Sequence, residues 1–91
     1  MNPVSLRDLP RGSRARIVEM PAGGECSERL EAMGIRVGKD VVKLSGMPFH
    51  GPVTLLLGGR QIAIGWKMSC SVMVLPLGME EMRHDHGRLQ G

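Results

Sequence analysis

The feature that most constrains this fold is a series of short, β-branched or leucine-rich runs, each bounded by glycine or proline. They lie at residues 14–20, 40–44, 53–57, 61–64 and 72–75. Runs of this kind are typical of β-strands, and glycine at the corners allows sharp turns. We expect the last strand to stop at Pro76 and Gly78. Short strands joined this way close more easily into a small barrel than into an open sheet.

One helix is predicted between the first two strands, over residues 25–33. Cys26, Leu30 and Met33 recur at the i, i+4, i+7 spacing of a single helix face, which is expected to pack on the barrel. Gly34 follows, as is common just past a helix end. Residues 66–70 are predicted to form one helical turn. The fold class is therefore mostly β, a small barrel of about five strands with one inserted short α-helix.

Residues 57–60 predict a tight hairpin, because Gly58 and Gly59 can supply the positive φ angles of a two-residue turn. With 91 residues the chain has material for one small core. After residue 77 it carries mixed charges and no apolar period, so we predict one domain over residues 1–77 and a disordered tail over 78–91.

Cysteine usage and hydropathy indicate a cytoplasmic protein. The chain has only two cysteines, far apart in sequence, and small disulfide-held secreted domains carry more. It opens without a basic, apolar leader, and no stretch approaches the roughly twenty apolar residues that span a bilayer. We therefore expect reduced thiols and no direct membrane insertion.

No catalytic site is predicted. Gly34 and Gly38, followed by Lys39, resemble a phosphate-binding loop, but only three residues separate the glycines and Asp40 stands where Ser or Thr is required. The histidines offer no catalytic group either, because none is accompanied by both a nucleophile and an orienting acid. We therefore expect the protein not to be an enzyme.

Metal binding has only weak candidates. His84 and His86 flank one carboxylate in the tail, and Cys26 and Cys70 add two softer ligands. Neither cysteine belongs to the close ligand pair of a structural zinc site. The methionines at 20, 33, 68 and 73 fall where core residues are expected, so gap filling explains them better than coordination. We predict no intrinsic metal and no cofactor.

The segment between the second and third predicted strands is the best candidate for a partner surface. Pro48 and Pro52 brace it, and it projects Met47, Phe49 and His50. Its other interpretation is a lid over the barrel with Phe49 packed inward.

Positive side chains just after the predicted helix extend this candidate surface. Arg36 and Lys39 could steer an acidic partner toward it.

The formal net charge is +3, and basic residues come from several predicted strands and turns. They are Arg11, Arg14, Arg16, Lys39, Lys43, Arg60 and Lys67. Small barrels that read nucleic acid stack bases on exposed aromatics, and Phe49 with Trp66 make a poor platform. We interpret the charges as a solvated face and expect no nucleic-acid partner.

The order of short motifs resembles the FeoA family over roughly residues 5 to 77. The matching pieces are Leu9-x-x-Gly12, Ala15-x-Ile17, Arg29-Leu30-x-x-Met33-Gly34-Ile35-x-x-Gly38, Pro48, Gly51-Pro52-Val53, Ile62-Ala63-Ile64 and Val72-x-Val74. The most specific is the run 29–38, with Met33 where the family more often has Leu. The chain departs from the family pattern at two places. One is the tail beyond Pro76, and the other is Cys70, where the family more often has a small residue.

The resemblance implies an SH3-like barrel and an accessory role in bacterial ferrous iron uptake. The implied partner is the transporter FeoB, through its cytosolic GTP-binding region, and the family has no catalytic residues to carry over. Related barrels form C-terminal domains of metal-dependent repressors, so a repressor-associated or nucleic-acid-binding barrel is the alternative. A third interpretation, an iron carrier to the transporter, rests only on the dispersed Cys, His and Met.

Overall fold

The computed structural model describes residues 2–46 and 51–79. Its elements are β1 (Val4–Ser5), η1, a 3₁₀ helix (Leu6–Asp8), β2 (Ser13–Glu19), α1 (Gly24–Ala32), β3 (Asp40–Gly46), β4 (Val53–Leu57), β5 (Arg60–Ile64), α2 (Trp66–Ser71) and β6 (Met73–Met79). The predicted partner residues Met47, Phe49 and His50, and the tail histidines His84 and His86, lie outside the described ranges.

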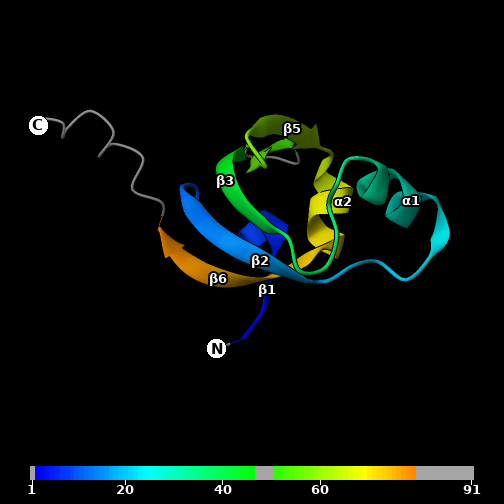
Figure 1. The fold of residues 1–91 in the computed structure, drawn as a ribbon, viewed down its shortest axis with the longest axis horizontal. Coiled ribbons are helices and arrows are strands. Elements are labelled where there is room, and N and C mark those ends of the chain that lie inside the picture. Colours follow the sequence, from blue (N-terminus) through cyan, green and yellow to red (C-terminus); the bar gives the residue numbers. More distant parts are fainter. Residues whose placement is uncertain (1, 47–50, 80–91) are drawn as a thin grey trace, which may run out of the picture.

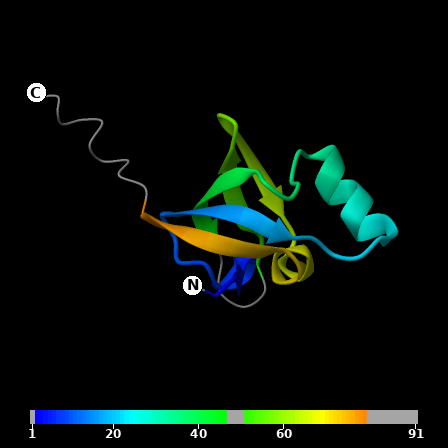
Figure 2. The same cartoon turned by 60° about the horizontal axis from the view of Figure 1, so that its bottom comes forward.

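The six strands form one antiparallel sheet in the order β1-β6-β2-β3-β4-β5. The sheet curls around the core, and α1 stands beside it as a separate arm (Figures 1 and 2). Register shifts in the β2–β6 and β3–β4 pairs add the local bends that such curling needs. The fold is SH3-like. Among the described residues no pairing joins β1 to β5, so the sheet keeps two edges.

The core fills the inside of this curl with aliphatic side chains. Alternation places Ala15 and Ile17 of β2 inward, and Val53, Leu55 and Leu57 of β4 do the same. Further buried residues come from outside the sheet: Leu6, Leu9, Leu30 and Ile35. Leu30 is 0% exposed, so α1 packs on the barrel through the face that the sequence predicts.

The predicted strands and helices are confirmed, with two differences. A sixth strand, β1, pairs over only two residues and leaves no sequence signal. The predicted stop at Pro76 is wrong, because β6 continues to Met79. Pro76 stands opposite Ala15 next to a register shift, and a proline without an N–H is tolerated at such an irregular position.

The two glycine turns follow the sequence prediction. Gly58 and Gly59 have φ angles of 59° and 83°, which are those of a two-residue hairpin turn between β4 and β5. Gly34 follows α1 with a φ of 91°. Its N–H bonds to the carbonyl of Glu31, and the N–H of Ile35 bonds to that of Leu30, which closes the helix end.

Candidate docking groove

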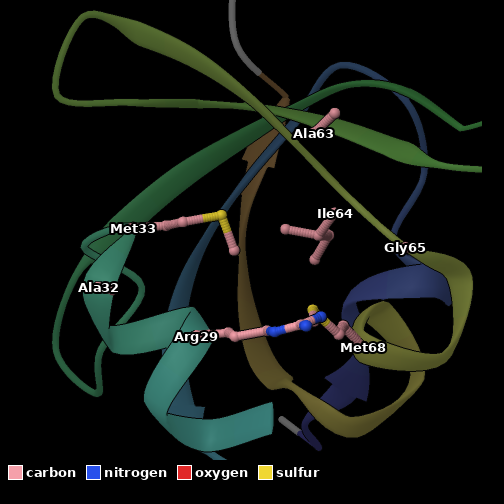
Figure 3. A pocket seen from close by; sticks show the side chains of 7 residues that line it. All are labelled: Arg29, Ala32, Met33, Ala63, Ile64, Gly65 and Met68. Atoms are coloured by element: carbon pink, nitrogen blue, oxygen red, sulfur yellow. The ribbon is translucent and has the colours of Figure 1, made fainter. Parts of the chain in front are cut away.

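A hollow of about 340 Å³ lies between α1 and the segment from the end of β5 to α2. Its lining residues are Arg29, Ala32, Met33, Ala63, Ile64, Gly65 and Met68. We call this hollow the α1–β5 groove. Figure 3 shows Met33 and Ile64 extending into it from opposite sides. Apart from Arg29, every lining side chain is apolar or absent, so the groove is suited to an aliphatic group.

The wall formed by α1 is held in place at the end of the helix. Buried Leu30 anchors the helix face, and Met33 packs partly against the same core. From β5, Nη2 of Arg60 donates a hydrogen bond of 3.1 Å to the backbone carbonyl of Met33. This bond ties the end of α1 to the start of β5 and limits their separation.

The opposite wall follows from the way β5 ends. Ile64 is 2% exposed and closes the floor, while Gly65 precedes α2 without a side chain. Ser69 of α2 is buried and donates its hydroxyl to the carbonyl of Trp66, and its N–H bonds to the carbonyl of Gly65. These bonds lie within α2 and its N-cap and stabilise the helical turn that carries Met68.

Positive charge borders the groove. The side chain of Arg29 is 64% exposed, and its nearest acidic partner is Glu25, one helical turn earlier, at 3.8 Å. Such an exposed, long ion pair contributes little energy, so the guanidinium of Arg29 can pair with another carboxylate. Arg60 adds a second cation at the start of β5. The groove therefore favours an apolar group accompanied by a negative one.

Two of the predicted partner residues, Arg36 and Lys39, do not line this groove. Arg36 and Lys39 are exposed in the turn between α1 and β3, where the N–H of Lys39 bonds to the carbonyl of Arg36. Lys39 borders a second hollow, of about 290 Å³, together with Gly34, Asp40, Leu57, Gly58 and Arg60. The described chain thus brings Lys39 near Arg60, a juxtaposition that sequence spacing did not reveal.

Asp40 in that second hollow is already engaged. Its carboxylate accepts bonds of 2.8 Å and 3.3 Å from Nε and Nη2 of Arg16 in β2. The hydrogen bond from Arg16 is the main reason that the pKa of Asp40 lies below its usual value. The side chain therefore stays ionised and stabilises the β2–β3 pair.

The cysteines proposed as weak metal candidates are both free and half-buried, Cys26 on α1 and Cys70 on α2. Cys26 packs partly against the core, as expected for a small apolar side chain. Within residues 2–46 and 51–79, no group of three or more His, Cys, Asp or Glu side chains comes together. The other metal candidates, His84 and His86, lie outside that part.

Sequence reasoning missed the groove because its residues had another assignment. Met33 and Met68 were expected to fill gaps in the core, and both do pack partly against it. The same side chains also line the groove. The usable signal was a pair of flexible methionines, one just after α1 and one on α2, since methionine is frequent on adaptable binding surfaces.

The fold and the groove define the class: a small SH3-like β-barrel with an inserted helix. The FeoA domain model matches residues 4–76, and the chain belongs to the FeoA family.

Solved structures agree with this assignment. The crystal structure of an iron uptake regulatory protein (FeoA) is 29% identical, with a TM-score of 0.78 over 84% of this chain and 100% of that one. The solution structure of iron(II) transport protein A from Clostridium thermocellum is 26% identical, with a TM-score of 0.75 over 81% of this chain and 46% of that one.

A manganese-dependent transcriptional repressor shares the fold at 14% identity, with a TM-score of 0.78 over 85% of this chain and 42% of that one. No curated protein sequence matches the chain. No helix in the described part of the chain has the length and apolar character needed to cross a membrane.

Proposed function

We propose that this protein is a non-catalytic accessory of bacterial ferrous iron uptake that docks on the cytosolic GTP-binding region of a FeoB-type transporter. The observation that carries the proposal is the FeoA domain match over residues 4–76. The 29% identical iron uptake regulatory protein adds support, because the chain covers all of it. FeoA domains are accessory domains without catalytic residues, so the contribution of this chain is binding.

Location follows from the same proposal. The protein acts in the cytoplasm, where the GTP-binding region of the transporter lies, and approaches the membrane only through that partner. Its net charge of +3 favours a partner with an acidic surface, since opposite charge accelerates encounter.

The proposal is tested by binding of the full chain to the intact transporter reconstituted in lipid nanodiscs. Biolayer interferometry should show saturable binding that a large excess of unlabelled chain competes away. Nanodiscs without transporter are the control. A chain that binds both surfaces equally, or neither, would contradict the proposal.

The alternative is a repressor-associated barrel, and the observation in its favour is the likeness to the manganese-dependent transcriptional repressor. The chain spans less than half of that protein, at 14% identity, which supports a common fold and no common role. DNA binding by the purified chain at physiological salt would favour this alternative over the transporter.

A further inference from the structure

The free edge of the sheet lies at β5, because β5 is the last strand in the order and pairs only with β4 among the described residues. The other end of the sheet is β1, which has only two residues. A very short strand is a common way to protect an edge from further pairing. No such protection applies to β5, which presents five residues.

Hairpin geometry identifies which backbone groups face that edge. Leu57 and Arg60 flank the two-residue turn, so they exchange both of their hydrogen bonds. Pairs then alternate along an antiparallel ladder, which turns the backbone N–H and C=O of Gln61 and Ala63 away from β4. Both residues are exposed, so these four groups are accessible to an incoming strand.

Side-chain alternation connects the edge to the groove. Ile62 and Ile64 point inward, since Ile64 is buried and Ile62 packs partly against the core. In an added strand, the residue opposite Ile64 points to the same face. On that face Ile64 lines the α1–β5 groove opposite Met33, which follows α1 directly (Figure 3). One aliphatic side chain of the added strand would thus enter the groove.

From this arrangement we infer that the protein binds an extended, acidic segment of its partner as a seventh strand on β5. The segment places one aliphatic side chain in the α1–β5 groove and a carboxylate beside Arg29. Main-chain bonds to Gln61 and Ala63 supply affinity, and the groove and Arg29 supply selectivity. This inference rests on the proposed function, since it describes how the transporter would be held.

Charge favours a partner segment over a second copy of the chain. Arg29 on the groove wall and Arg60 at the start of β5 place two cations near the edge. Pairing β5 with β5 of another protomer would add further cations and no acidic side chain, because β5 has the sequence RQIAI, so charge does not favour it. An acidic segment meets the same cations with opposite charge.

The main test removes one outward-facing donor and leaves the β4–β5 ladder complete. In Ala63→Pro the lost N–H is one that β4 does not use, and proline is tolerated on an edge strand in that orientation. Val37→Ala, at an exposed apolar residue outside the groove lining, is the control. With transporter in nanodiscs and the full chain, we expect Ala63→Pro to raise the Kd at least tenfold and Val37→Ala to leave it within twofold.

A charge pair tests the acidic part of the inference. Arg29→Glu should also raise the Kd at least tenfold, whereas Glu28→Lys, which changes an exposed α1 residue outside the groove lining, should leave it within twofold. Unchanged binding by folded Arg29→Glu would overturn the assignment of an acidic segment.

Amide exchange in the wild-type chain gives a readout that needs no variant. On transporter binding, the N–H groups of Gln61 and Ala63 should exchange more slowly, which holds even where Ala63→Pro fails to fold. Unchanged exchange, or unchanged binding by folded Ala63→Pro, would overturn strand addition alone. No binding by the wild type would overturn the proposed function as well. A dimer that Ala63→Pro dissociates would identify a second copy as the occupant and overturn the partner.

Discussion

Nζ of Lys43 in β3 donates a hydrogen bond of 2.7 Å to the backbone carbonyl oxygen of Arg7 in η1. Lys43 is buried, which is unusual for a lysine. Its own carbonyl accepts the N–H of Gly12 at 2.7 Å. These two bonds tie the N-terminal segment to the middle of the sheet. Strand β3 therefore pairs with its neighbouring strands and also holds the N-terminal segment in place.

Burial of Lys43 makes stability depend on alkaline pH. Desolvation is the main cause of a pKa below the ordinary lysine value of 10.5. At pH values between the folded-state pKa and 10.5, the unfolded chain therefore binds more protons than the folded one. Stability rises with pH across this range. Lys43→Met lacks this titration. Urea unfolding from neutral to alkaline pH should show the wild type gaining stability relative to Lys43→Met, and parallel curves would contradict the effect.

The Arg16–Asp40 ion pair predicts a dependence on acidic pH. The hydrogen bond from Arg16 lowers the pKa of Asp40 below the ordinary value of 3.8. Its contribution is therefore complete above 3.8 and is lost as pH falls through the folded-state pKa. Asp40→Asn should reduce the acid-side fall in melting temperature. Glu31→Gln, an exposed change on α1, is the control, and equal acid-side slopes for all three proteins would refute the prediction.

Alanine substitutions at three glycines, beginning with Gly34, should destabilise the fold to different degrees. A Cβ at Gly34 would lie 3.2 Å from Cδ2 of Leu57 and 3.3 Å from Nη2 of Arg60, at a φ of 91°. Gly34→Ala should thus add crowding to a backbone cost of about 1–2 kcal/mol. Gly38→Ala has a similar φ in open space and should show the backbone cost alone, while Gly65→Ala has neither penalty. Chemical denaturation should show the largest loss in free energy of unfolding for Gly34→Ala, a smaller one for Gly38→Ala and the smallest for Gly65→Ala. Any other order contradicts this account.

Leu30 predicts the strength of the α1 contact with the barrel. The side chain is 0% exposed within the core. Leu30→Ala should lower the free energy of unfolding by about 2 to 5 kcal/mol, as large-to-small core changes do. Glu28→Ala, on the exposed side of the same helix, should change it by less than about 0.5 kcal/mol. A normal thermal transition in Leu30→Ala would show that α1 contributes little to stability.

Local sequence signals were sufficient for most of the fold. The turn at Gly58 and Gly59 and the helix stripe through Leu30 depend on residues close together in the chain, so pattern and propensity identify them. Strand β1 could not be found this way, because its two residues are defined only by their partners Met73 and Val74 in β6.

Burial of Lys43 was not predicted, because lysine is rarely buried. Alternation puts Lys43 on the same face of β3 as buried Val41, and Val42 between them is buried as well. A register shift between Lys43 and Ser45 breaks the regular pairing with β4. The sequence analysis placed Lys43 on a basic surface, and the structure corrects that assignment. The α1–β5 groove escaped prediction similarly, since elements distant in sequence form it.

The last prediction concerns the surface that the sequence analysis proposed. Arg36 and Lys39 are exposed and well placed to steer an acidic partner. Arg36→Glu combined with Lys39→Glu should slow association and weaken its dependence on salt, because screening acts on long-range attraction between exposed charges. Phe49→Ala, in the segment outside the described residues, should instead weaken binding by at least about 1 kcal/mol. The loss of an apolar anchor should act mainly through faster dissociation.

Surface plasmon resonance with transporter at low and high salt separates these effects from those at the groove. The Arg36 and Lys39 variant should match the wild-type rate of association at high salt, where the Debye length shrinks to a few ångström. Ala63→Pro acts through main-chain bonds, so its faster dissociation should persist at high salt. If the Arg36 and Lys39 variant associates like the wild type at every salt concentration, those two charges do not steer the partner, and the cations around the groove remain the only ones assigned to it.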